Sequence, residues 1–120
     1  MPVKHVMIFV KDLPRMTRFY RDALGFTLVA QSSSAEWSEF EGGLALHAAP
    51  ATMAAALVIS DPPRPRSETP IKLVFTVDDV SLARGLLLAQ GATMQEPKAS
   101  GGCDGVDPEG NVFQIVPARA

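Results

Sequence analysis

An internal repeat constrains this chain more than any other feature, because the second half restates the first at an offset of 67 positions. Val10-Lys11-Asp12-Leu13 returns as Val77-Asp78-Asp79-Val80, and in each copy a strand-like run enters a helix through an aspartate. The stretch from Gly43 to His47 falls opposite the stretch from Gly110 to Gln114. Such self-similarity indicates two copies of one supersecondary unit. If the copies face each other, equivalent positions line a cavity from both sides.

The two halves have the same predicted order of elements. In the first half, residues 3–10 are rich in β-branched and aromatic side chains and predict a strand, Asp12 caps a helix, and Gly25 ends it. Three shorter strands are expected at 26–31, 35–41 and 44–49. The second half predicts a strand at 71–77, a helix at 79–90, and strands at 92–96, 102–106 and 112–116. Each half is therefore a βαβββ module.

The segment between the modules is rich in proline. Residues 50–70 contain Asp61-Pro62-Pro63-Arg64-Pro65, and prolines argue against a helix or a central strand there. The chain thus divides into a first module at 1–49, a connector at 50–70 and a second module at 71–120, within one structural domain. The expected fold class is α+β. Two tandem modules with pseudo-twofold symmetry would form a curved sheet around a cavity, with the helices on the outside.

Strand alternation predicts which side chains line the cavity, because successive residues of a strand point to opposite faces of a sheet. The aliphatic residues of each first strand should pack on the helices, and the residues between them should face the cavity. The predicted cavity residues are His5, Met7, Phe9 and His47 in the first module and Lys72, Val74 and Gln114 in the second. If Phe40 packs inward, Trp37 and Glu39 join the first set. An aromatic wall suits planar ligands, although Trp37 could equally lie at a subunit interface.

Composition excludes several function classes. The net charge is only −2, and no basic run is dense enough to predict nucleic-acid binding. No stretch approaches the roughly 18 apolar residues of a membrane span, and the N-terminus lacks the pattern of a signal peptide. Cys103 is the single cysteine, so an intrachain disulfide is impossible and a cytoplasmic location is expected. No neighbouring base can be assigned to make Cys103 a catalytic thiol.

Four motifs carry a resemblance to a known family. They are the run from His5 to Leu13, Phe19-Tyr20 with the following Arg-Asp-Ala-Leu-Gly-Phe26, Phe75-Thr-Val-Asp-Asp-Val80, and Asp107-Pro-Glu-Gly-Asn111. With paired βαβββ modules, they resemble the vicinal oxygen chelate superfamily, which includes glyoxalase I, extradiol dioxygenases, and the bleomycin- and fosfomycin-resistance proteins. The resemblance covers nearly the whole chain and specifies the fold better than any one reaction.

The resemblance also implies where a metal would bind. Metal-using members place His or Gln on the first strand of each half and carboxylates on the closing strands. Here only His5 matches in type, while Lys72, His47 and Gln114 stand at the other three positions. An ammonium about 5 Å from a divalent ion repels it by roughly 6 to 7 kcal/mol at an effective dielectric of about 20. We therefore expect no metal cofactor, with His5, His47 and Glu39 as the fallback ligand set if a divalent metal does bind.

Three functional hypotheses follow. The first is a metal-independent protein that holds a small organic, possibly anionic, ligand in a cavity, as the bleomycin-resistance type does, and that forms a homodimer. In it, Lys72 is a cationic anchor for an acidic group, although a lysine there can also simply extend to solvent. The second is a metal-dependent lyase, isomerase or dioxygenase of the same superfamily. The third, an enzyme centred on Lys72, has only that residue to support it.

Overall fold

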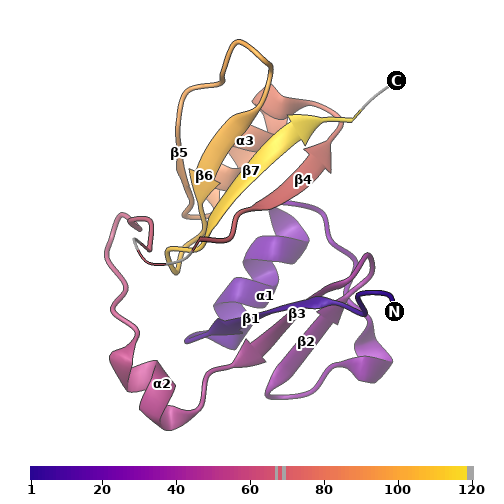
Figure 1. Cartoon of the computed structure of the whole chain (residues 1–120), viewed down its shortest axis with the longest axis vertical. Coiled ribbons are helices and arrows are strands. Elements are labelled where there is room, and N and C mark those ends of the chain that lie inside the picture. Colours follow the sequence, from indigo (N-terminus) through magenta and orange to yellow (C-terminus); the bar gives the residue numbers. More distant parts are fainter. Residues whose placement is uncertain (67, 69, 119–120) are drawn as a thin grey trace. The chain divides into compact units, whose positions relative to one another are not determined.

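The computed structural model describes residues 1–66, 68 and 70–118, and it divides the chain into two compact units, Met1–Val58 and Ile59–Ala120 (Figure 1). Each unit holds one small mixed sheet with its helices, as expected for an α+β fold of two modules. The boundary between the units falls inside the predicted connector at 50–70. Positions 67 and 69 of that connector and positions 119 and 120 of the second module lie outside the described residues.

The first unit is built on a three-stranded sheet. Its elements are β1 (Val6–Val10), α1 (Leu13–Asp22), the short 3-10 helix η1 (Ala30–Ser32), β2 (Trp37–Phe40), β3 (Leu44–Ala48) and α2 (Ala51–Ala56). The strand order is β1-β3-β2, so the closing strand β3 lies in the centre. It pairs in parallel with β1 and antiparallel with β2.

The second unit repeats this plan with one more strand. Its elements are β4 (Leu73–Val77), α3 (Val80–Ala89), β5 (Thr93–Met94), β6 (Cys103–Val106) and β7 (Val112–Pro117). The strand order is β4-β7-β6-β5, in which β7 again pairs in parallel with the first strand of its unit. The offset that relates the halves of the sequence therefore relates equivalent strands of the structure.

The predicted helix boundaries are confirmed by their capping contacts. The Asp12 carboxylate accepts a hydrogen bond from the Arg15 amide at 3.1 Å, and the Asp79 carboxylate accepts one from the Leu82 amide at 3.0 Å. Each contact satisfies a first-turn amide that has no partner within the helix. Gly25 follows the first helix with a φ of 75°, a left-handed backbone conformation that glycine adopts without steric cost.

The core of each unit lies between its long helix and one face of its sheet. The largest buried side chains there are Met16, Phe19, Tyr20, Phe40 and Leu46 in the first unit, and Leu87, Phe113 and Ile115 in the second. The Tyr20 and Phe40 rings lie 6.5 Å apart between α1 and β2. Phe40 and Phe113 both pack inward, as the alternation predicts. The opposite face of each sheet therefore carries the residues between them.

The strand predicted at 26–31 is the clearest error in the secondary structure. The chain there makes one isolated antiparallel bridge, between Leu28 and Phe40, and then enters η1. The Val29 amide still donates to the Glu39 carbonyl at 2.7 Å, and the Glu41 amide to the Thr27 carbonyl at 2.9 Å. Serine side chains offer the backbone local hydrogen bonds that compete with a sheet, as the Ser33 hydroxyl does by donating to the Val29 carbonyl. The predicted strand at 92–96 is likewise shortened, to Thr93–Met94.

The connector also contains a helix, which the proline argument excluded. The helix α2 occupies Ala51–Ala56, before the first proline of the Pro62 to Pro65 run. Alanine has the highest helix propensity of all residues, and proline at a helix start costs little because that amide needs no intrahelical partner. Pro50 stands at the N-cap position of α2. The prediction was wrong because it applied the effect of the later prolines to the whole segment.

The end of the connector is bound to the second unit. The Arg66 amide donates to the Gly110 carbonyl at 3.0 Å, and its guanidinium donates to the Glu109 carbonyl at 2.6 Å. Both carbonyls belong to the turn at 107–111, which the buried Asp107 carboxylate organises by accepting from the amides of Glu109 and Asn111, each at 2.9 Å. The Asp-Pro-Glu-Gly-Asn motif is thus a tight turn, as predicted, and its carbonyl groups also bind Arg66.

Gly105 of β6 provides a test of packing in the second unit. A Cβ atom there would overlap the Met94 sulfur and lie 2.8 Å from Cζ of the buried Phe113 ring. Gly105→Ala should lower the free energy of unfolding by about 1 to 3 kcal/mol, measured by urea denaturation. Gly85→Ala on α3, where a Cβ meets nothing within 4 Å, should instead raise it by up to about 1 kcal/mol. Equal effects of the two substitutions would contradict this packing.

Candidate functional site

The predicted ligand-binding side chains of the first unit lie on the sheet face that α1 does not cover. In the register of the sheet, Phe9 pairs with His47, and His47 pairs with Trp37. Met7 lies opposite Ala45, which in turn lies opposite Glu39. Directly paired residues share a face, so three strands contribute to one surface. The structure brings together the first-module residues as the alternation predicts.

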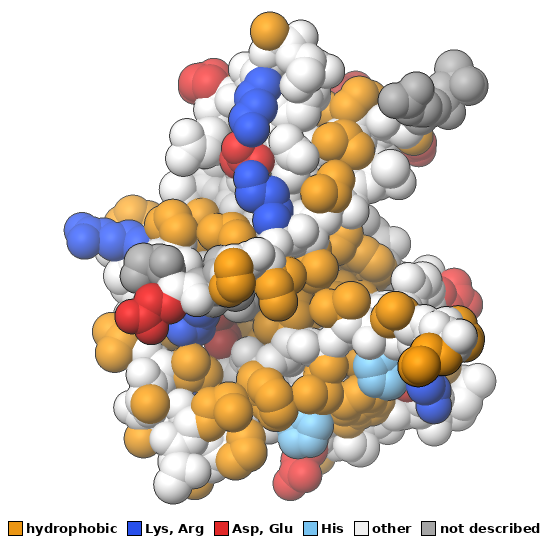
Figure 2. Space-filling view, in the orientation of Figure 1, with side chains coloured by type: hydrophobic (Ala, Val, Ile, Leu, Met, Phe, Trp, Pro, Cys, Tyr) orange, Lys and Arg blue, Asp and Glu red, His pale blue; other side chains and the backbone are white. Residues whose placement is uncertain are grey.

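Trp37 is at the centre of an aromatic cluster on this face. Its ring centroid lies 5.2 Å from that of His5 and 5.8 Å from that of His47, both in edge-to-face geometry. The Phe9 ring lies 5.5 Å from the His47 ring. We call these four residues, His5, Phe9, Trp37 and His47, the aromatic face. Met7 and Phe9 remain 38% and 37% exposed, and Figure 2 shows both histidines among hydrophobic side chains.

Hydrogen bonds fix the polar atoms of the aromatic face. The Nδ1 atom of His47 lies 2.6 Å from the Ala48 carbonyl oxygen. A carbonyl can only accept, so Nδ1 carries the proton, and in the neutral ring Nε2 is then a free acceptor. The Trp37 indole donates to Oε1 of Glu39 at 3.4 Å. The face therefore has apolar walls and an imidazole acceptor.

The described side chains on this face do not assemble a set of metal ligands. His5, His47 and Glu39, the fallback ligand set, belong to the same face, but Glu39 is engaged by the indole of Trp37. Across the described part of the chain, no group of three or more histidine, cysteine or acidic side chains could hold a metal ion. A divalent ion in a protein needs about three such donors or more. The residues present thus do not fit the metal that the family resemblance implies.

The second unit has a charged cluster on its corresponding face. Val74 pairs with Gln114 and Gln114 with Asp104, so these residues share the face that α3 does not cover. Oδ1 of Asp104 lies 3.2 Å from Nζ of Lys72, and Oδ2 lies 2.8 Å from Nζ of Lys98. We call these three charged residues, Lys72, Lys98 and Asp104, the lysine cluster. Figure 2 shows basic side chains with an acidic one between them over the β6–β7 part of this sheet.

The electrostatics of the lysine cluster keep Asp104 ionised. The hydrogen bond from Lys98 is the largest cause that lowers the pKa of Asp104; partial burial opposes it, and Lys72 adds to the lowering. Two ammonium groups then face one carboxylate, which leaves one positive charge in excess. Lys72 is thus not a solitary cation, but the cluster as a whole still favours an anion.

Sequence reasoning missed Asp104 and Lys98. The alternation of residues 102–106 is the signal that places Asp104 on the same face as Gln114. Lys98 lies in a loop before β6, where no periodicity predicts the direction of a side chain. The Gln114 side chain packs against Gly102. A Cβ atom at Gly102 would lie 3.0 Å from Nε2 of Gln114, so the glycine provides room for this side chain.

Cys103 has a structural environment. Its side chain is fully buried on the inward face of β6, and its thiol donates to the Gln95 carbonyl at 3.2 Å. Burial raises the pKa of this thiol above its usual value, against a smaller lowering by Arg84. A buried, protonated thiol is a poor nucleophile. The contacts of Cys103 are those of a core residue.

Comparisons with known proteins agree with this architecture. The model of the Glyoxalase/Bleomycin resistance protein/Dioxygenase superfamily matches residues 3–115. Among solved structures, the chain is similar to a glyoxalase/bleomycin resistance protein/dioxygenase family enzyme from Burkholderia phytofirmans PsJN, with 22% identity and a TM-score of 0.74. That match covers 99% of this chain and 100% of the other. No curated protein matches the chain.

Two further similar structures have more specific descriptions. One is TnmS3, an antibiotic binding protein from Streptomyces sp. CB03234, with 23% identity, a TM-score of 0.67, and coverage of 99% of this chain and 97% of that one. The other is the fosfomycin resistance protein FosX from Listeria monocytogenes, complexed with Mn(II) and sulfate. It has 16% identity and a TM-score of 0.71, with coverage of 98% and 90%. At these identities the similarity establishes the fold.

The lysine cluster predicts an acid-dependent contribution to stability. Because the pKa of Asp104 is lowered on folding, its ion pairs stabilise the protein above the unfolded pKa of about 3.9 and are lost as the pH falls through the folded pKa. Asp104→Asn should therefore unfold at a lower temperature than the parent near pH 7, and the difference should shrink as the pH is lowered below about 3.9. Asp78→Asn, at an exposed position, is the control. A difference that persists undiminished in acid would contradict this role.

Proposed function

This chain belongs to the glyoxalase/bleomycin resistance protein/dioxygenase superfamily, and we propose that it acts there as a metal-independent binding protein for a small organic molecule. The observation that carries the proposal is the aromatic face, in which the half-buried Trp37 lies between His5 and His47, beside the exposed Met7 and Phe9. Exposed aromatic and thioether groups beside a few polar atoms are typical of ligand-binding surfaces.

The chemistry of the aromatic face selects a class of ligand. The indole of Trp37 and the ring of Phe9 offer contact area to an apolar or planar group. Nε2 of His47 accepts a hydrogen bond because its other ring nitrogen is already bonded to the Ala48 carbonyl. The preferred ligand thus combines a flat apolar part with an N–H or O–H donor.

The lysine cluster of the second unit, considered by itself, favours an acidic ligand. Its two ammonium groups are oriented by Asp104 and exceed it by one charge. An anion that contacts Lys72 or Lys98 gains charge-assisted hydrogen bonds. An organic acid therefore suits the chain better than a cation of the same shape.

Metal independence is proposed from the donor set. The closing-strand positions that carry carboxylates in metal-using members hold His47 and Gln114 here, and the first-strand position of the second module holds Lys72. An ammonium group disfavours a nearby divalent cation. Similar structures include both TnmS3, described as antibiotic binding, and FosX, complexed with Mn(II), so the fold alone does not decide the matter.

A second candidate function is a divalent-metal-dependent lyase, isomerase or dioxygenase. One observation favours it: His5, His47 and Glu39 share a face, and Nε2 of the neutral His47 ring could donate a lone pair to a metal. Oε2 of Glu39 would be the oxygen for a metal, because the Trp37 indole donates to Oε1.

We also propose that the protein is a cytoplasmic homodimer. The single cysteine agrees with a reducing compartment, and dimers are expected from the resemblance to ligand-sequestering members of the family. Light scattering of the purified protein measures the oligomeric state directly.

Metal content separates the two candidate functions. Protein purified without tags or chelators, and then incubated with zinc, nickel, manganese or ferrous iron, should retain only trace metal by elemental analysis, because the described residues assemble no set of donors. His5→Ala should leave that trace unchanged. A stoichiometric ion that is lost in His5→Ala would reject metal independence and support the enzyme.

Ligand binding at the aromatic face can be measured through Trp37, the only tryptophan of the chain. A panel of aromatic acids and their amides should include compounds that change its fluorescence. His47→Phe keeps a ring but removes the acceptor, so affinity should fall by roughly three- to tenfold. Val58→Ala, which alters an exposed apolar residue outside the strands, is the matched control.

Two results would count against this assignment. Equal loss of affinity in His47→Phe and Val58→Ala would show that the aromatic face is not part of the binding site. No change of Trp37 fluorescence with any compound of the panel would do the same.

A further inference from the structure

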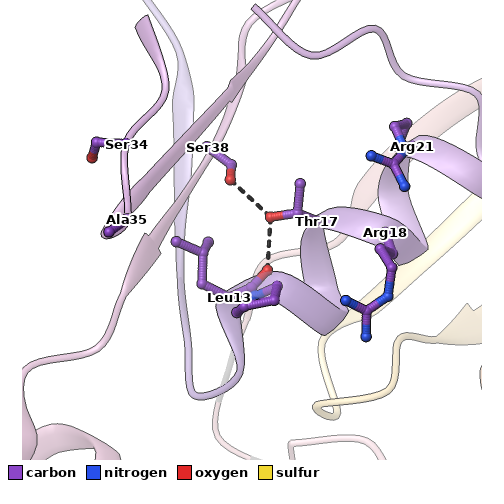
Figure 3. A pocket seen from close by; sticks show the side chains of 8 residues that line it. Leu13, Thr17, Arg18, Arg21, Ser34, Ala35 and Ser38 are labelled. Atoms are coloured by element: carbon purple, nitrogen blue, oxygen red, sulfur yellow. Dashed lines mark hydrogen bonds between the residues drawn. The ribbon is translucent and has the colours of Figure 1, made fainter. Parts of the chain in front are cut away.

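The first unit has a pocket on the side of its sheet opposite the aromatic face. It has a volume of about 380 Å³ and is lined by Leu13, Pro14, Thr17, Arg18, Arg21, Ser34, Ala35 and Ser38. Ser38 lies between Trp37 and Glu39 in β2, so its side chain points away from theirs and toward α1. Figure 3 shows α1 on one side of the pocket and the segment of Ser34 and Ala35 on the other.

The floor of the pocket presents hydrogen-bond acceptors. The Thr17 hydroxyl donates to the Leu13 carbonyl at 2.7 Å, and the Thr17 and Ser38 hydroxyl oxygens lie 2.7 Å apart (Figure 3). A hydroxyl group has one hydrogen, and Thr17 donates its hydrogen to the Leu13 carbonyl. In the contact between the two hydroxyl groups, Ser38 is therefore the donor and Thr17 the acceptor. Ser38 is buried, and its remaining capacity is that of an acceptor. A group that meets the floor must therefore donate a hydrogen bond.

The helix wall of the pocket is cationic. Arg18 and Arg21 are three residues apart in α1, and side chains with this spacing lie on the same side of a helix. Arg21 uses Nε and Nη2 to bind Asp22, at 2.8 and 3.4 Å, so Asp22 does not occupy the hydrogens of Nη1. Two guanidinium groups and one carboxylate leave one positive charge in excess. The wall therefore favours an anionic group.

We propose that this pocket binds a small hydroxylated anion, a compound that has a phosphate or carboxylate group next to a hydroxyl-bearing carbon chain. The anionic group is bound by Arg18 and Arg21, for which planar, charge-assisted contacts with phosphate or carboxylate oxygens are favourable. The hydroxyl group donates to Ser38, and Leu13 and Ala35 contact the carbon chain. The volume suits a ligand at the small end of the usual range.

This site is independent of the function proposed above. It uses the helix side of the sheet, while the aromatic face uses the other side, and it shares no side chain with the aromatic face or the lysine cluster. A result at one site therefore leaves the other untouched.

The test uses glycerol 3-phosphate and lactate as hydroxylated anions, with glycerol and inorganic phosphate as the separate halves of the phosphate compound. Binding is followed by amide chemical shifts of isotope-labelled, full-length protein at about 150 mM salt, which screens weak surface attraction. We expect saturable shifts centred on Thr17, Arg18 and Ser38 for at least one hydroxylated anion. Glycerol and inorganic phosphate should each bind at least about tenfold more weakly than glycerol 3-phosphate.

Variants identify the groups that bind. The double variant Arg18→Gln/Arg21→Gln should lower the affinity for the hydroxylated anion by at least about tenfold. Arg15→Gln is the matched control, because Arg15 belongs to the same helix and does not line the pocket. Ser38→Ala should reduce the preference for glycerol 3-phosphate over inorganic phosphate. The amide spectrum of each variant verifies its folding.

Three results would overturn the proposal. The first is the absence of saturable shifts with both hydroxylated anions. The second is a loss of affinity in Arg15→Gln equal to that in the double variant, which would mean general attraction to a basic helix. The third is inorganic phosphate binding as tightly as glycerol 3-phosphate, which would leave the hydroxyl group without a role.

Discussion

The parallel pairing of the first and last strands in each unit determines which face of the sheet the long helix covers and which face carries the candidate site residues. The strand β3 pairs with β1, and β7 pairs with β4, so the closing strand of each unit becomes a central strand. Parallel neighbours need a crossover connection, and the long helix that supplies it covers one face of the sheet. The other face stays open along the first and closing strands, where His47 and Gln114 lie. The helix side and the open side of each sheet follow from this one pairing.

Much of this arrangement could be predicted because it depends on local patterns. Aspartate caps, glycine stops and strand alternation act over a few residues, and they placed both long helices and the shared face of Phe9, Trp37 and His47. The ion pairs of Asp104 could not be predicted in the same way, because its partner Lys72 is 32 positions away and its second partner lies in a loop. Long-range ion pairs depend on side-chain reach, which no periodicity encodes.

The two copies of the repeat have acquired different chemistry at equivalent positions. His5 contacts an aromatic ring, while its partner Lys72 contacts a carboxylate. His47 packs between Trp37 and Phe9, while its counterpart Gln114 rests over a glycine. One copy is therefore suited to apolar contact and the other to charge. A repeated backbone thus carries two chemically different surfaces, one on each unit, because the side chains at equivalent positions differ.

The segment 27–29, which fails to become a strand, protects its neighbour from self-association. The outer edge of β2 would otherwise present free amides and carbonyls, which can template the addition of a strand from another chain. Two hydrogen bonds, from the Val29 amide to Glu39 and from the Glu41 amide to Thr27, occupy part of that edge, and η1 then turns the chain away. A single bridge is too short to become a new sheet edge of its own. The irregular backbone at this position thus limits the addition of a strand from another chain.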